Sequence, residues 1–143
     1  MYRQILIPVD GSETSRAALQ ESLKLARDQG AQVRLVYVCE PVKHVVVEGV
    51  IDLTAAVRRE GESVLEQALG QARAAGVEAA TALVESGSRR VAAAIVDEAA
   101  AAGADLIAMG THGRQGVEHL LLGSVAEGVA RRAGVPVLLI RGR

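Results

Sequence analysis

The sequence predicts an α/β fold in which a parallel sheet is covered by helices on both faces. Two observations carry this prediction: short apolar runs alternate with longer helical patterns along the whole chain, and the apolar runs are continuous. Continuous runs are typical of parallel strands buried on both faces, and strand–helix alternation is typical of the crossovers between them. The length of 143 residues favours one domain over residues 1–143.

Five apolar runs predict the strands. The first and fourth runs are the least interrupted, so we expect them at the centre of the sheet. The third run contains Glu78 and Thr81, which suits an edge strand. In chain order the predicted strands are residues 4–9, 33–38, 78–84, 106–109 and 136–140.

Four helical patterns lie between the strands, with apolar residues recurring at spacings of three and four. They cover residues 13–29, 54–75, 88–102 and 124–133. A glycine follows each pattern, and glycine is the expected stop because it alone enters the left-handed conformation cheaply. These glycines are Gly30, Gly76, Gly103 and Gly134.

One long connection, from Cys39 to Leu53, has no predicted helix and no predicted place in the sheet. Connections of this length are functional lids, partner surfaces or disordered segments. The sequence leaves these three open.

The last strand has the features of an edge strand and of a central one. It begins at Pro136, which suits an edge, yet Val137 to Ile140 is as apolar as a central strand. An exposed apolar edge invites pairing with another chain. We therefore expect a second copy of the protein to cover this strand, which makes a homodimer.

The composition excludes several classes of function. The net charge is −1, and only Tyr2 and Tyr37 are aromatic, so we expect no nucleic-acid binding by a basic surface or by base stacking. No run approaches the roughly 18 apolar residues of a membrane span. The one cysteine, Cys39, excludes an internal disulfide and is expected to be a small buried hydrophobe. A cytoplasmic protein is the expectation.

A glycine-rich segment follows the fourth strand. It reads Gly110-Thr-His-Gly113, then nine residues, then Gly123-Ser124 at the start of a helix. Glycines let the backbone approach a phosphate, and the free N–H groups at a helix start attract anions. The alternative is structural: Ser124 and Glu127 have the spacing of a capping box, which would make Gly123-Ser124 an ordinary helix start.

Two other phosphate-binding motifs are absent. A Walker loop needs Gly-Lys-Ser/Thr, but Ser124 follows Gly123 directly and the only lysines are Lys24 and Lys43. The dinucleotide fingerprint needs three glycines after the first strand, where the chain has Asp10-Gly11-Ser12.

The glycine pattern resembles the G-x-x-G-(nine residues)-G-S/T signature of the ATP-binding branch of the universal stress protein family. The beginning of the chain, residues 5–12, and its end, residues 136–140, are similar to that family as well, so the resemblance covers the whole chain. It implies a three-layer sandwich with a five-stranded parallel sheet of order 3-2-1-4-5 and helices on both faces. In such a sheet, ligands bind beyond the carboxyl ends of strands 1 and 4.

The resemblance also implies roles for individual residues. Asp10 would contact the adenosine, although Asp10 and Glu13 also have the spacing of a helix cap. Arg114 either reaches a phosphate or is a solvated loop residue. A Mg²⁺ ion bridging the phosphates would need few protein ligands. The remaining site residues would line the adenine slot (Pro8, Val9, Val38), lie along the ribose (Met109, Gly110) or hold the phosphates (Gly113, Gly123, Ser124, Val125).

Two functions are compatible with the sequence, and a third fits it poorly. The first is an ATP-binding regulatory homodimer of the stress response, and the second is a slow ATPase or self-phosphorylating protein using the same site. The third, a phospho-receiver domain, needs an acceptor Asp after the third strand and a Lys near the fifth, where the chain has Glu85 and Arg141. No catalytic grouping is evident, and His112 is read as a solvated loop residue or a general base. The histidines His44, His112 and His119 lack metal-site spacing.

Overall fold

The computed structural model describes residues 1–46, 49–113 and 122–142. Its main sheet has five parallel strands in the order β5-β2-β1-β6-β7. Counted along the chain within this sheet, that is the predicted order 3-2-1-4-5, which is confirmed. The strands are β1 (Gln4–Pro8), β2 (Gln32–Cys39), β5 (Ala79–Glu85), β6 (Leu106–Gly110) and β7 (Val137–Ile140).

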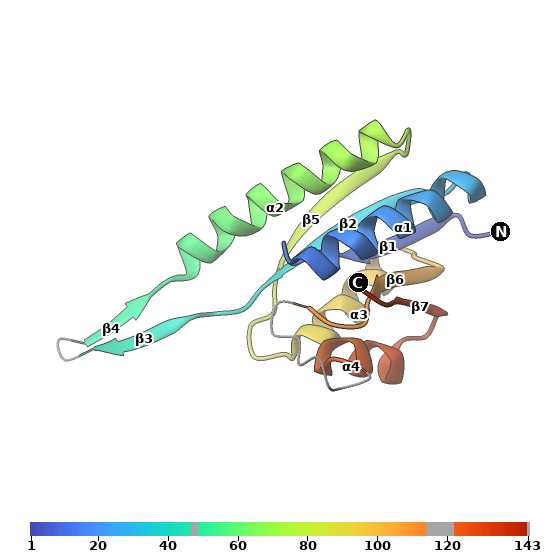
Figure 1. Cartoon of the computed structure of the whole chain (residues 1–143). Coiled ribbons are helices and arrows are strands. Elements are labelled where there is room, and N and C mark those ends of the chain that lie inside the picture. Colours follow the sequence, from blue (N-terminus) through green and yellow to red (C-terminus); the bar gives the residue numbers. More distant parts are fainter. Residues whose placement is uncertain (47–48, 114–121, 143) are drawn as a thin grey trace.

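Four helices cover the two faces of the sheet, as Figure 1 shows. The side chains of β1 explain both layers: Ile5 and Ile7 join one buried cluster with α1 and α2, while Leu6 joins a second cluster with α3 and α4. All three are buried, as period-two alternation requires of a strand covered on both faces. The helices are α1 (Glu13–Gln29), α2 (Thr54–Ala74), α3 (Val91–Ala101) and α4 (Ser124–Arg132).

The long connection forms an element that the sequence did not predict. It contains an antiparallel hairpin of β3 (Lys43–Val46) and β4 (Gly49–Asp52), which pair with each other in a separate two-stranded sheet. The backbone N–H of Leu53 donates to the carbonyl of Val42 at 2.9 Å, so the two ends of the hairpin lie together. Figure 1 shows the hairpin projecting away from the main sheet, beyond the beginning of α2.

Two predicted helix ends are wrong. Gly30 does end α1 in the left-handed conformation, with φ of 65°. After α4, however, the chain leaves through Ala133 in an extended conformation, and Gly134 is not among the glycines with positive φ. The helix predicted from residue 88 begins at Val91, because residues 86–90 form a turn in which Gly87 takes a φ of +60°.

Neither of the two capping boxes that the residue spacing offered as structural alternatives is formed. α4 is capped by Gly123 with no side-chain hydrogen bond, and the Glu127 carboxylate pairs with Arg131 instead. At α1 the cap is Ser12, whose Oγ accepts from the N–H of Ser15. No helix in the described part of the chain is both long and apolar enough to cross a membrane.

Candidate functional site

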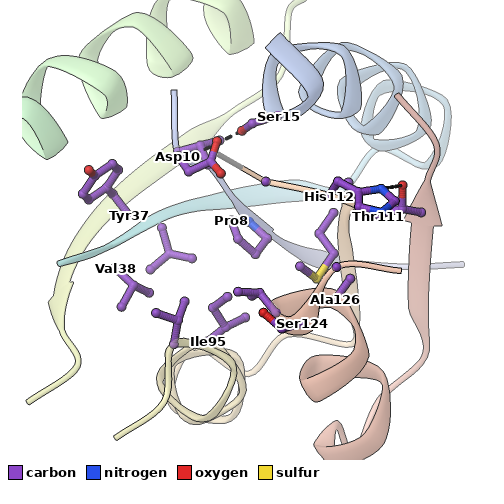
Figure 2. Close-up of a pocket in the computed structure, with 18 of the residues that line it drawn as sticks. Pro8, Asp10, Ser15, Tyr37, Val38, Ile95, Thr111, His112, Ser124 and Ala126 are labelled. Atoms are coloured by element: carbon purple, nitrogen blue, oxygen red, sulfur yellow. Dashed lines mark hydrogen bonds between the residues drawn. The ribbon is translucent and has the colours of Figure 1, made fainter. Parts of the chain in front are cut away.

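A pocket of about 240 Å³ opens where β1 and β6 end. These neighbouring strands lead into helices on opposite faces of the sheet, α1 and α4, and such a switch point leaves a crevice beyond the carboxyl ends of the strands. The pocket is lined by the ends of β1, β2 and β6, the beginning of α3 and the beginning of α4. Figure 2 shows side chains from these elements converging on one space.

One wall of the pocket is aliphatic. Val38 comes from β2, Pro8 ends β1, and Val91 and Ile95 lie one helical turn apart on α3. In Figure 2 Val38 and Ile95 stand at the same end of the pocket. This wall offers a surface of aliphatic side chains for a flat apolar group, and Tyr37 of β2 also lines the pocket.

The opposite wall carries Asp10, which follows β1. Its backbone N–H donates to Ser15 Oγ at 3.1 Å, and its carboxylate Oδ1 accepts from the N–H of Ser12 at 2.9 Å and from Ser12 Oγ at 2.6 Å. The carboxylate is therefore fixed by the turn that leads into α1. It places a hydrogen-bond acceptor of fixed position in the pocket.

The beginning of α4 forms a third part of the pocket, through Ser124, Val125 and Ala126. The first backbone bond into the helix runs from the N–H of Glu127 to the carbonyl of Gly123, at 3.0 Å. The N–H groups of the three preceding residues lie before that bond, where a helix leaves its donors without intrahelical partners. Among the described residues, no side chain forms a capping hydrogen bond at this end. An uncapped helix start in a pocket is suited to an anion.

Hydrogen bonds hold the described residues of the segment after β6; among them, the Thr111 N–H donates to the carbonyl of Ile140 at 3.0 Å. Thr14 Oγ1 donates to the carbonyl of His112 at 2.9 Å, which ties the segment to the start of α1. The N–H of Gly123 donates to the carbonyl of Thr111 at 2.7 Å, which closes the segment on itself. The Gly123 N–H is thus already used, so any anion at this end is left with the N–H groups that follow it.

The structure brings ten of the eleven sequence-predicted site residues together around this pocket; Arg114 lies outside the described residues. Their contact with a nucleotide stays a prediction. For His112 the sequence left two interpretations, a solvated loop residue or a general base. In the structure its half-buried side chain lines the pocket, with Nδ1 3.1 Å from Thr111 Oγ1. The ten are Pro8, Val9, Asp10, Val38, Met109, Gly110, Gly113, Gly123, Ser124 and Val125.

Sequence reasoning missed the contribution of α3. Val91 and Ile95 line the pocket, although they belong to no motif. Their spacing of four residues puts both on one helix face, and that was the available signal. Glu40, just beyond β2, was also missed and adds a second carboxylate to the pocket wall.

Among the described residues, no three His, Cys, Asp or Glu side chains lie close enough together to hold a metal ion. Cys39 is 2% exposed and packs in the core with α1 and α2. Burial raises the pKa of its thiol, which keeps it protonated and unreactive. The prediction that Cys39 is a buried hydrophobe is confirmed.

Comparison with known proteins gives a match to a family model. Residues 1–141 match the model of the universal stress protein family. A curated relative, universal stress protein MJ0531 of Methanocaldococcus jannaschii, is 36% identical over 144 residues, which span 99% of this chain and 83% of that protein.

Solved structures agree with this match. A universal stress family protein from Burkholderia pseudomallei superposes with a TM-score of 0.78 at 35% identity, covering 97% of this chain and 96% of that one. A universal stress protein in complex with cAMP has a TM-score of 0.76 at 25% identity, covering 99% of each chain. One from Archaeoglobus fulgidus in complex with dAMP has a TM-score of 0.71 at 25% identity, covering 97% of this chain and 98% of that one.

Proposed function

This chain belongs to the universal stress protein family, and we propose that it binds an adenine nucleotide, ATP in first place, in the pocket beyond β1 and β6. The observation that carries the proposal is the uncapped start of α4, which faces a pocket whose other walls are aliphatic and acidic. A nucleotide has the matching three parts: a flat apolar base, a ribose with hydroxyl donors, and a phosphate anion.

The aliphatic wall supports a place for the base. Adenine would lie against the side chains of Val38, Val91 and Ile95, beside the backbone of β2. The fixed carboxylate of Asp10 supports a place for the ribose, since a carboxylate accepts hydrogen bonds from hydroxyl groups.

The start of α4 supports a place for the phosphates. The N–H groups of Ser124, Val125 and Ala126 can donate to phosphate oxygens, and the helix dipole adds about 0.3–1 kcal/mol for an anion at such an end. A Mg²⁺ ion would then be held by phosphate oxygens and water, because the described pocket supplies no cluster of protein ligands.

Related structures support the choice of an adenine nucleotide. The relative in complex with cAMP and the Archaeoglobus fulgidus relative in complex with dAMP are both 25% identical to this chain over nearly its whole length. Cyclic and linear monophosphates share the base and one phosphate, which are the parts that the aliphatic wall and α4 are proposed to hold. ATP adds two further phosphates at the glycine-rich segment.

A homodimer through β7 completes the proposal. Val137 and Leu139 pack into the core with α3 and α4, but Leu138 on the other face is 39% exposed. A free strand edge with an exposed apolar side chain is suited to pairing with a second copy. In this dimer, nucleotide occupancy would regulate the stability of the protein or its surface for a partner.

Calorimetry with ATP, AMP and adenosine tests the binding. The same pocket should take all three, and ATP at about a hundred times its dissociation constant should stabilise the fold by roughly 2.7 kcal/mol, a melting shift of several degrees. No heat of binding and no melting shift at millimolar ATP with Mg²⁺ would contradict the proposal.

The variant Ser124→Pro isolates the start of α4. Proline is favoured at the first position of a helix, and the extended Gly123, with φ of −70° and ψ of 161°, accepts a following proline, so the helix should form normally. The change removes one N–H donor and should weaken ATP about tenfold while leaving adenosine unchanged. Ser124→Ala, which removes only the hydroxyl, is the matched control. Equal loss of ATP and adenosine binding would place the phosphates elsewhere.

A further inference from the structure

The backbone conformation of Gly113 does not explain why this position holds a glycine. Its φ lies outside the left-handed region, so an alanine meets no backbone strain there. A Cβ built on Gly113, however, would stand 2.5 Å from Asp10 Oδ2, well inside any real contact. By contrast, a Cβ on Gly110 in the same segment would meet nothing closer than 3.4 Å.

The Asp10 carboxylate cannot simply move aside. Its other oxygen, Oδ1, accepts hydrogen bonds from both the N–H and the Oγ of Ser12, and Ser12 Oγ also caps α1. A rotation that relieved the clash would break these bonds and disturb the cap. The carboxylate is therefore fixed from the α1 side.

Nor can the segment around Gly113 retreat freely. The carbonyl of the preceding residue, His112, accepts the hydrogen bond from Thr14 Oγ1 at 2.9 Å. Ser12 and Thr14 both lie at the start of α1, with their hydroxyl groups 3.1 Å apart, so the same turn holds Asp10 through Ser12 and the residue before Gly113 through Thr14. The two sides of the pocket are held at a separation that has room for a carboxylate but not for a carboxylate and a methyl group.

We propose that Gly113 acts as a positioning residue for Asp10: its missing side chain makes room for the Asp10 carboxylate, rather than for a phosphate. Asp10 is thereby fixed over the glycine-rich segment before any ligand arrives. This inference rests on the proposed function in one respect, namely that Asp10 contacts the adenosine part of the nucleotide.

The proposal separates the two glycines of the signature. Gly113 would serve the adenosine end of the site, through Asp10. A Cβ on Gly123 would stand 3.0 Å from the backbone carbonyl oxygen of Thr111, a tight contact beside the hydrogen bond that Gly123 donates to that carbonyl.

A double-mutant cycle with Asp10→Ala and Gly113→Ala tests the proposal, with adenosine and ATP as ligands. Gly113→Ala alone should weaken the binding of both ligands by the same factor, about tenfold. This is the size of coupling seen between residues in contact. In the Asp10→Ala background, where the carboxylate is gone, Gly113→Ala should have no further effect. If Gly113 served a phosphate instead, the affinity losses of Gly113→Ala and Asp10→Ala would multiply in the double variant, and Gly113→Ala would leave adenosine binding unchanged. Either result overturns the proposal.

A melting experiment without ligand keeps this test independent of nucleotide binding. Gly113→Ala should lower the melting temperature of the wild-type protein but not of Asp10→Ala. Gly134→Ala is the matched control, because Gly134 has an ordinary φ and nothing within 4 Å of a built Cβ. If the wild type binds no adenine nucleotide, the proposed function fails while this arm still decides the contact. An equal loss of melting temperature from Gly113→Ala in the wild-type and Asp10→Ala backgrounds would overturn the proposed role of Gly113.

Discussion

Asp105 holds the beginning of the central strand. Its carboxylate accepts hydrogen bonds from the backbone N–H of Arg3, at 2.9 Å, and of Gln4, at 3.0 Å. These residues lie about a hundred positions away along the chain, so one side chain joins the start of β1 to the turn before β6. Burial acts to raise the pKa of this carboxyl, but the N–H donors outweigh it, and the pKa is lowered from its ordinary value of 3.8.

Asp105→Asn should therefore destabilise the protein in a pH-dependent way. A group whose pKa is lowered by folding contributes stability above its unfolded pKa and loses that contribution as the pH falls through the folded value. We expect a loss of about 1 kcal/mol at pH 7, modest because the side chain is partly exposed. The difference from wild type should close below pH 3.8.

Urea unfolding at several pH values measures this effect. Asp28→Asn, which removes the same charge from an exposed position on α1, is the control and should change the free energy of unfolding little. A difference for Asp105→Asn that stays constant down to pH 2 would show that the carboxylate is not the cause.

At the scale of elements, α2 contacts the sheet through a glycine. A Cβ on Gly61 would lie 2.6 Å from the Tyr37 ring and 2.7 Å from Leu83, so the helix packs here by bringing its backbone against β2 and β5. Gly70 lies on the same helix with nothing within 4 Å of a built Cβ. The two positions therefore allow the same substitution to be compared at a packed site and at an open site of one helix.

The same substitution should have opposite effects at these two positions. Alanine gains up to about 1 kcal/mol of helix propensity over glycine at either. At Gly61 the overpacking should outweigh that gain and destabilise the protein by about 1–2 kcal/mol net, whereas Gly70→Ala should stabilise it. Thermal melting of both variants checks this; a stabilised Gly61→Ala would mean that α2 lies farther from the sheet.

Elements with a strong local pattern were predictable, and those fixed by distant contacts were not. The unbroken runs in β1 and β6 gave their central positions directly, because both faces of each strand are buried. The β3–β4 hairpin was missed because residues 47–48, between its strands, are Val-Glu, not the Asn-Gly or Asp-Gly pair typical of tight turns.

The candidate site also contains residues that the sequence could predict and residues that it could not. The residues that follow β1 and β6 were predictable, since parallel strands bring their carboxyl ends to one edge of the sheet. Val91 and Ile95 were not, because the helix face turned toward the pocket depends on how α3 packs against α4 and β2. The steric reason for Gly113 needed the side-chain positions of Asp10.

For the whole molecule, the proposed dimer makes β7 the critical edge. Leu138→Glu puts a charge on the exposed face of this strand, while Leu139, which packs in the core, is unsuitable because its loss would damage the fold itself. We expect Leu138→Glu to sediment as a monomer at micromolar concentration with its secondary structure intact.

Ala80→Glu provides the matched control. Ala80 is exposed on β5, the edge strand at the other end of the sheet, so a charge there should leave the dimer unchanged. A wild-type protein that sediments as a monomer at the same concentration would remove the dimer altogether.

The parallel order of the sheet also affects how the protein folds and how it is degraded. Pocket residues lie near positions 10, 38, 91, 110 and 124, so the pocket is complete only once both halves of the chain have folded. Such long-range pairing is slow to form, and a ligand that binds the finished pocket stabilises only the complete fold. With the proposed nucleotide bound, proteolysis should therefore slow at sites throughout the chain when cleavage requires global opening, so pocket occupancy would lengthen the life of each molecule.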